Sequence, residues 1–263
     1  MTFGYDADVV KLWSMAGSNT LRHNGTNLAY AVSDRRRECK SRPIIFIAHS
    51  LGGLVCEQAL LVCREDIILE NVLRSTLGII FMGTPHAGSD LAEWGYKIAT
   101  YLNVVRKTNS EIMGVLKQRS EVLSAVQQQF QKLLQKDEVN IGVYCFFEEK
   151  AVVGVGTIVP QQSAVLNQFP CQSIAANHMD MTKFSGKNDD GYQRVLGRVR
   201  DFTDLMKIPA KRRRQTMEET EPEAKRLKYS EETLKIDFQP SFPGDSGTSL
   251  RVQKEGGNGR ISR

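Results

Sequence analysis

A serine separates a strand pattern from a helix pattern in the first quarter of this 263-residue chain. Residues 43–54 are Pro-Ile-Ile-Phe-Ile-Ala-His-Ser-Leu-Gly-Gly-Leu, and the apolar run at 44–47 is typical of a buried parallel strand. Good helix formers follow from Leu54 to Cys63. We therefore expect a strand, a tight turn at Ser50 and then a helix.

The residues two positions before and after Ser50 are both small, Ala48 and Gly52. This is the G-x-S-x-G pattern with its first glycine replaced by alanine, and it is typical of the nucleophile elbow of an α/β-hydrolase. An elbow lifts the serine hydroxyl above the end of the sheet and aims the first N–H groups of the next helix at the reaction centre. The alternative is a strand-turn-helix with an inert serine.

A nucleophilic serine needs a base, and the chain has four histidines. His178 follows the last predicted strand and fits the chain order nucleophile, acid, histidine. His23 lies in a polar helical stretch and is expected to be exposed. His49 stands beside the serine but cannot turn its side chain back onto it, and His86 comes too early. The alternative for His178 is a loop histidine that caps the final helix.

The acid that orients the base is expected after a strand between Ser50 and His178. Glu148 and Glu149 end the predicted strand at 140–147, and we favour Glu148, with Glu149 solvated. Asp180 is a third candidate, although it follows the histidine in the chain.

Strand-like runs at 44–48, 77–82, 140–147 and 172–176 alternate with helical patterns at 20–38, 53–65, 111–136 and 191–207. This alternation predicts an α/β fold with a mostly parallel sheet and helices on both faces. Within 111–136, apolar residues recur at helical spacing, which indicates either a core-facing helix, our preference, or part of a lid. They are Ile112, Leu116, Leu123, Val126, Phe130 and Leu133. We expect a globular domain at 1–207 and a disordered, charged tail at 208–263.

Composition argues against several classes of protein. No apolar run approaches the roughly 18 residues of a membrane span, and Met1 to Asp8 lack the pattern of a secretory signal. The five cysteines form no C-x-x-C pair, which favours free thiols in a reducing compartment over a zinc site. A net charge of +5 does not by itself argue for nucleic acid. We therefore expect no metal, no cofactor and no transmembrane segment.

The tail carries two basic clusters separated by ten residues, Lys211-Arg212-Arg213-Arg214 and Lys225-Arg226-Leu227-Lys228. The spacing is typical of a bipartite nuclear localisation signal, which would bind an import carrier and place the protein in the nucleus or cytoplasm. The alternative is a solvated, charged tail. Direct nucleic-acid binding is not expected, because glutamates lie between the clusters and no aromatic context supports it.

Five segments together resemble a known module. They are 48–53, 83–89, 147–148, 158–166 and 177–184, and they are similar to the lipase/esterase module of the DUF676 and serine-active-site-containing type. The module is similar to GPI inositol-deacylases and is found in fungal proteins ahead of NACHT-type NTPases or ankyrin repeats. The resemblance covers about 1–207. It implies an α/β-hydrolase in which Ser50 is the nucleophile, Glu148 the acid and His178 the base, and it implies association with mitochondrial or endoplasmic reticulum membranes.

Family members usually begin with further strands and a His-Gly-Leu-Gly-type loop ahead of the elbow, whereas Met1 to Ala7 resemble the strand just before the elbow's own. We therefore expect the first strands to be missing and the oxyanion hole to keep the Leu51 N–H without its usual partner. The leading hypothesis is a serine hydrolase of carboxylic esters, including lipid acyl esters. The alternative is a weak or inactive recognition module with the hydrolase fold. Asp90 and Trp94 are expected either at the substrate entrance or in ordinary capping and packing.

Overall fold

A computed structural model describes residues 1–2, 18–86, 93–94, 97, 123–136 and 139–205. The elements follow the predicted alternation, and residues 123–134 are also helical. In chain order they are α2 (Ser18–Arg35), β1 (Ile44–His49), α3 (Leu51–Glu65), α4 (Glu70–Ser75), β2 (Thr76–Met82), β3 (Gly142–Glu148), α7 (Gln161–Ala164), β4 (Cys171–Ile174) and α8 (Asp190–Leu205). The short helices α4 and α7 were not predicted.

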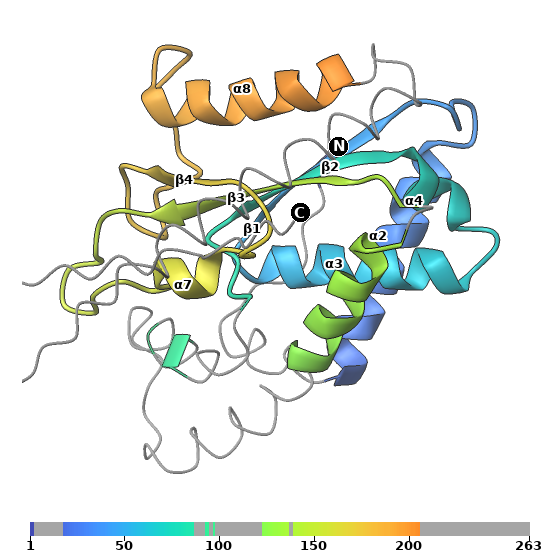
Figure 1. The fold of residues 1–263 in the computed structure, drawn as a ribbon, viewed down its shortest axis with the longest axis horizontal. Helices are drawn as coiled ribbons and strands as arrows, with labels where there is room; N and C mark the ends of the chain where they lie inside the picture. The colour runs from blue at the N-terminus through green and yellow to red at the C-terminus, as the bar shows by residue number, and fades with distance from the viewer. Residues whose placement is uncertain (3–17, 87–92, 95–96, 98–122, 137–138, 206–263) are drawn as a thin grey trace, which may run out of the picture. The chain divides into compact units, whose positions relative to one another are not determined.

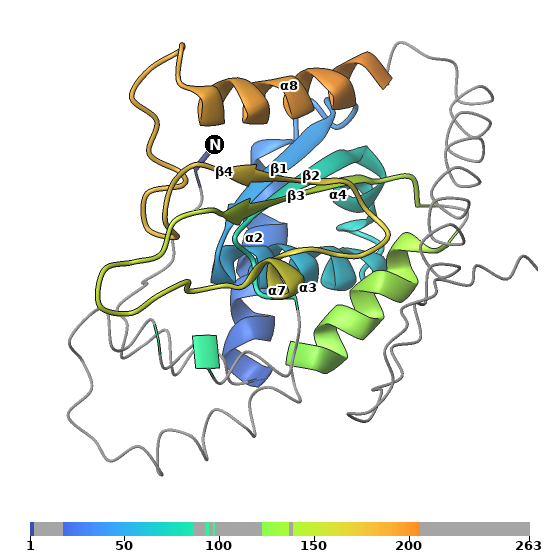
Figure 2. The same ribbon diagram turned by 60° about the vertical axis from the view of Figure 1, so that its left-hand side comes forward.

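The strands form a sheet in the order β1-β2-β3-β4, and every neighbouring pair is parallel. Helix α8 covers one face, while α2, α3 and α7 lie on the other (Figures 1 and 2). The predicted fold class, a parallel α/β sheet with helices on both faces, is therefore confirmed. Because the strands are parallel, their carboxyl ends meet at one edge of the sheet, where Ser50 and Glu148 are found.

Alternate side chains of each strand enter two separate cores, as the two-residue period of a strand requires. Ile79 and Phe81 of β2 pack with the apolar residues of α2 and α3, whereas Ile80 and Met82 pack with those of α8. Both faces of β2 are thus buried, which explains its nearly continuous apolar sequence.

Two glycines let α8 approach its face of the sheet closely. Gly78 of β2 and Gly142 of β3 are register partners. A β-carbon at either position would come within 2.4–2.5 Å of the Phe202 ring. The aromatic ring of α8 therefore lies directly on a patch of bare backbone, and this contact fixes where the helix sits on the sheet.

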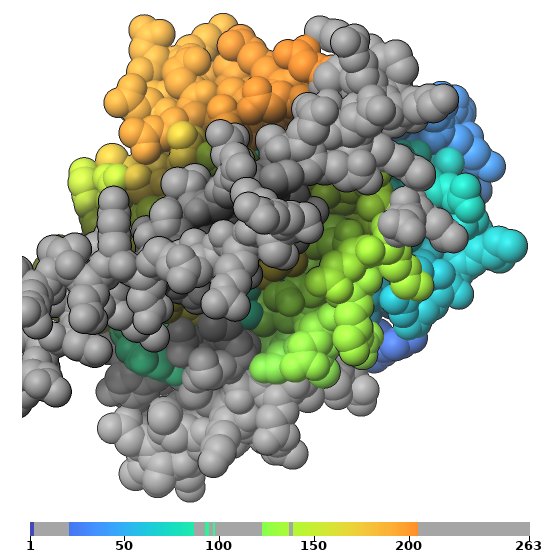
Figure 3. Space-filling model, viewed as in Figure 1, coloured from blue at the N-terminus to red at the C-terminus, as the bar shows by residue number. Residues whose placement is uncertain are grey.

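The helical residues 123–134 bear out the core-facing interpretation of their apolar stripe. Leu123, Val126, Phe130 and Leu133 are all buried in the core shared with α2 and α3. The opposite side of the segment forms part of the molecular surface (Figure 3). Trp94 is buried in the same core, in agreement with its packing interpretation.

Several predictions fall outside the described residues. They concern the strand at Met1–Ala7 beyond its first two residues, Asp90, the first half of the 111–136 helix, and the basic clusters at 211–214 and 225–228. The chain divides into two units, Met1–Ile208 and Pro209–Arg263, and the whole of the second unit lies outside the described ranges.

Candidate active site

Ser50 forms a strained turn between β1 and α3. Its φ of 54° and ψ of −131° lie outside the ordinary regions, and among the described residues it is the only non-glycine with positive φ. The turn is held by the Ser50 N–H, which donates to the Met82 carbonyl at 2.9 Å, and by the Gly53 N–H, which donates to the Ser50 carbonyl at 3.0 Å. The serine hydroxyl does not cap α3 and is left to face another partner.

Gly53 is a further position of the elbow, beyond Ala48 and Gly52, at which the structure requires a small residue. A β-carbon at Gly53 would come within 2.1 Å of the Thr84 hydroxyl oxygen. Gly53 therefore lets the first turn of α3 pack directly against the loop that follows β2. Ile79 to Met82 lead into that loop, so the elbow and the end of the neighbouring strand form one packed unit.

His178 lies between Ser50 and Glu148. Its Nε2 is 2.9 Å from the Ser50 Oγ, and its Nδ1 is 3.0 Å from Oε2 of Glu148. A carboxylate can only accept, so a proton on Nδ1 leaves the Nε2 lone pair free to accept from the serine hydroxyl. The Nδ1–H is not aligned as a linear hydrogen bond requires, a common feature of catalytic groups without substrate.

The second carboxylate oxygen of Glu148 is anchored by backbone. Its Oε1 accepts from the N–H of Ile158 and, at 3.2 Å, from the N–H of Val159. The Glu148 and His178 side chains are 0% and 1% exposed. Two backbone donors thus hold the carboxylate in an apolar setting, with its other oxygen toward the histidine. A fixed, desolvated carboxylate interacts strongly with a neighbouring imidazole.

A turn built on Asn177 presents His178 to the site. The Asn177 side-chain carbonyl accepts from the N–H of Met179 at 2.9 Å and from the N–H of Asp180 at 3.1 Å, and its backbone carbonyl accepts from the N–H of Met181 at 3.0 Å. This is an Asx-type turn. It places the histidine immediately after β4, at the same edge of the sheet as Ser50.

The other two candidate acids have partners elsewhere. Glu149 accepts from the hydroxyl of Ser173, and Asp180 forms an exposed ion pair with Lys183 at 2.9 Å. The Lys183 and Asn177 side chains hold the pKa of the Asp180 carboxyl below its usual value. Of the three carboxylates proposed from the sequence, the structure brings only Glu148 to His178.

His86 lies in a buried contact with Glu57 rather than near the serine. Its Nδ1 is 3.0 Å from Oε1 of Glu57, and the two side chains are 2% and 0% exposed. His86 also packs edge-on against Phe81, with ring centroids 4.7 Å apart. His23 is exposed on α2, as predicted. The pair therefore ties the loop after β2 to the middle of α3.

Leu51 is the first residue of α3 and is 1% exposed. The N–H of a first helical residue has no acceptor within its own helix. Since Leu51 directly follows Ser50, this N–H lies at the N-terminal end of α3, beside the serine. The partial positive charge of a helix N-terminus favours negative charge at the same place.

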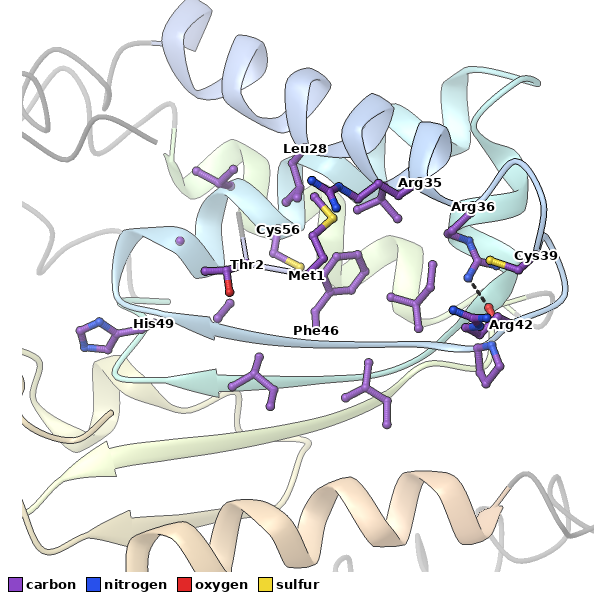
Figure 4. A pocket seen from close by; sticks show the side chains of 18 residues that line it. Met1, Thr2, Leu28, Arg35, Arg36, Cys39, Arg42, Phe46, His49 and Cys56 are labelled. Atoms are coloured by element: carbon purple, nitrogen blue, oxygen red, sulfur yellow. Dashed lines mark hydrogen bonds between the residues drawn. The ribbon is translucent and has the colours of Figure 1, made fainter. Parts of the chain in front are cut away.

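A groove of about 690 Å³ runs along β1 (Figure 4). Most of its lining is apolar and comes from α2, β1 and α3, with Met1 and Thr2 at one side. Arg35, Arg36 and Arg42 also line it. Among the described residues, β1 pairs only with β2, so the groove follows the other edge of β1. Ser50 and His178 do not line the groove, whereas His49, the residue before Ser50, does.

The described residues carry neither a metal-binding cluster nor a membrane-spanning helix. In the described ranges, no group of three or more His, Cys, Asp or Glu side chains is arranged to hold a metal ion. None of the helices in those ranges combines the length and apolar character needed to cross a membrane.

Comparison with known proteins gives the chain a family. Residues 15–171, more than half of the chain, match the family described as "Putative serine esterase (DUF676)". The chain belongs to this family. The DUF676 match includes the elbow, Glu148 and the loop that anchors it, and it ends as β4 begins.

Curated relatives of this DUF676 protein include Protein SERAC1 from three mammals. The Homo sapiens protein is 31% identical over 165 residues, which are 61% of this chain and 24% of the relative. The Mus musculus protein is 32% identical over 160 residues, 59% of this chain and 23% of the relative. The Bos taurus protein is 30% identical over 165 residues, with 61% and 24% covered. The matched part of the chain thus spans about a quarter of the length of these relatives.

Proposed function

We propose that this protein is a serine hydrolase that cleaves carboxylic esters, with Ser50 as nucleophile, His178 as general base and acid, and Glu148 as the residue that orients the histidine. The observation that carries the proposal is the unbroken contact from the hydroxyl of a strained serine through a buried imidazole to an anchored carboxylate. Membership of a serine esterase family supports the same reaction class.

In the first half of the reaction, the Ser50 Oγ attacks the ester carbonyl carbon while its proton passes to Nε2 of His178. The carbonyl π electrons move to oxygen, and the resulting oxyanion is stabilised by the Leu51 N–H at the N-terminus of α3. When the tetrahedral intermediate collapses, the alkoxy group leaves with the proton from His178. The products are an alcohol and an acyl-serine.

In the second half, water takes the place of the alcohol. His178 removes a proton from the water as it attacks the acyl carbon, and the same proton returns to the Ser50 oxygen when the acyl bond breaks. The carboxylic acid leaves and the free serine is restored. Glu148 stays ionised throughout, fixes the proton of the resting histidine on Nδ1 and stabilises the imidazolium that forms twice per cycle.

The experiment that tests the proposal is hydrolysis of p-nitrophenyl acetate and p-nitrophenyl palmitate by purified full-length protein, beside Ser50→Ala and Ser33→Ala. Ser33 lies on α2 and serves as the matched control. We expect turnover and covalent fluorophosphonate labelling in the wild type and in Ser33→Ala, and neither in Ser50→Ala. Preference for the palmitate would extend the proposal to lipid acyl esters. Folded wild-type protein with neither turnover nor labelling would refute it and favour a recognition module with the hydrolase fold.

A further inference from the structure

His49, the residue directly before the nucleophile, contacts the backbone of the residue that acts as base in the proposed function. Its Nε2 is 2.9 Å from the carbonyl oxygen of His178. A carbonyl only accepts hydrogen bonds, so Nε2 of His49 carries the proton and donates. The two imidazole rings also lie close together, with centroids 4.9 Å apart and planes at 37°.

Consecutive residues of the elbow therefore hold His178 at two points. Ser50 contacts its ring at Nε2, and His49 binds its backbone carbonyl. His49 lies at the carboxyl end of β1, and its ring extends beyond the end of the strand (Figure 4). The strand therefore fixes the position of the donor.

The loop that carries His178 is tied to neighbouring segments of the chain by the Lys150 N–H, which donates to the Ala176 carbonyl at 3.2 Å, and by Met181, which is buried in the core beside α8. It follows β4, a strand of four residues with two exposed positions, and the hydrogen bonds of the Asn177 turn are all internal to the loop. None of these bonds reaches β1, which is three strands away in the sheet. The bond from His49 spans that separation directly.

We propose that His49 is a positioning residue of this site: by donating a hydrogen bond to the His178 carbonyl, it sets the distance between the base and the serine hydroxyl. This inference rests on the proposed function of Ser50 and His178. A misplacement of about 1 Å between reacting groups can cost roughly a hundredfold in rate, so a bond that sets this distance affects turnover rather than substrate binding.

The charge state of His49 suits this role. The pKa of His49 is lowered from 6.5 to about 4, by burial first, then by the charge of His178 and to a smaller degree by Lys183, while the bond to the His178 backbone opposes the shift. The Lys183 ammonium is itself paired with Asp180. His49 therefore stays neutral near pH 7 and donates without placing a second cation beside the imidazolium that forms on His178.

The test compares His49→Leu, which removes the donor, with His49→Gln, whose amide N–H replaces it, and with His23→Leu as a matched control on α2. We expect His49→Leu to lower kcat by about ten- to a hundredfold for p-nitrophenyl acetate, with KM changed less than about twofold. His49→Gln should recover most of the loss, and His23→Leu should match the wild type. Unchanged kcat in His49→Leu, or equal losses in the Leu and Gln variants, would overturn the inference.

A second readout separates this inference from the proposed function. The His178 imidazole signals in NMR spectra report its environment without turnover. Both His49 variants lose the ring-current shift of the neighbouring imidazole, but we expect the signals to broaden only in His49→Leu, and those of His23→Leu to match the wild type. An inactive wild type would count against the proposed function alone, whereas His178 signals as sharp in His49→Leu as in His49→Gln would overturn the positioning role of His49.

Discussion

Gly83 packs directly against the ring of His178. A β-carbon at Gly83 would come within 3.0 Å of Cε1 and Nδ1 of the imidazole, and within 2.9 Å of the Met181 sulfur. Gly83 has a φ of +57°, and its N–H donates to the Phe146 carbonyl at 2.8 Å. The loop after β2 therefore packs its bare backbone at Gly83 directly against the His178 imidazole.

Replacing Gly83 by alanine should lower kcat by roughly ten- to a hundredfold and the free energy of unfolding by about 1–3 kcal/mol. The new methyl group would displace the imidazole, and the left-handed backbone would be strained by any side chain. Steady-state kinetics and urea unfolding measure the two effects. Gly197→Ala is the matched control, because its β-carbon meets nothing within 4 Å in helix α8, and it should gain about 0.5–1 kcal/mol in stability.

Glu148→Gln should lower kcat by roughly 10³–10⁴-fold with little change in KM. The amide can still accept from the backbone at 158–159, so the site keeps its shape, but it loses the charge that stabilises the imidazolium. Glu149→Gln is the neighbouring control and should retain wild-type kcat, since Glu149 contacts Ser173 instead. Equal effects of the two variants on esterase kinetics would contradict the assignment of Glu148.

Glu57→Leu should destabilise the fold by about 1–3 kcal/mol, because it leaves the buried polar imidazole of His86 without the carboxylate that it faces. Replacing both residues, as in Glu57→Leu with His86→Leu, should cost less than the sum of the single changes. Urea unfolding of the four proteins gives the coupling directly. Additive losses would mean that the two side chains do not interact in solution.

Gly142→Ala should cost about 1–3 kcal/mol, because its methyl group would overlap the Phe202 ring. Trimming the ring in Phe202→Leu makes room, so the double variant should be more stable than the sum of the two single losses predicts. Thermal unfolding measured by circular dichroism tests this. If Gly142→Ala causes no loss of stability, α8 must lie farther from the sheet than described.

Stability should fall as the pH drops from about 6.5 toward 4, in part because of His49. Its pKa is lowered to about 4 in the folded protein, so over this range the unfolded chain binds a proton that the native state does not. Lower pH therefore favours unfolding through this group. The free energy of unfolding of His49→Gln should depend less on pH between 6.5 and 4 than that of the wild type. Parallel curves for the two proteins would contradict the lowered pKa.

The fold was predictable because its main elements have strong local patterns. The apolar run at 44–47 and the continuous apolar sequence of β2 mark buried strands, and α8 and the 123–134 segment carry helical stripes. Helices α4 and α7, with 6 and 4 residues, are too short to show a period and were missed.

The supporting residues of the site were not predictable from local sequence. The bond from His49 joins residues 129 positions apart, and the need for glycine at 53 and 83 arises only where segments distant in the sequence pack together. One signal was available for the choice between Glu148 and Glu149. Consecutive residues at the end of a strand point to opposite faces, so only one of them can face the loop that carries His178.

The order of the strands affects how such sites can be lost. The serine follows β1, while the histidine follows β4, the last strand in sequence order within the described residues. A substitution or deletion that disturbs β4 would displace His178, the base of the proposed reaction, and leave the elbow intact. Relatives that lost turnover in this way would still match every residue from the elbow strand to Glu148. If active relatives were identified by the serine motif alone, inactive ones would therefore be included. The four residues of β4 and the turn after them would be a better criterion for activity.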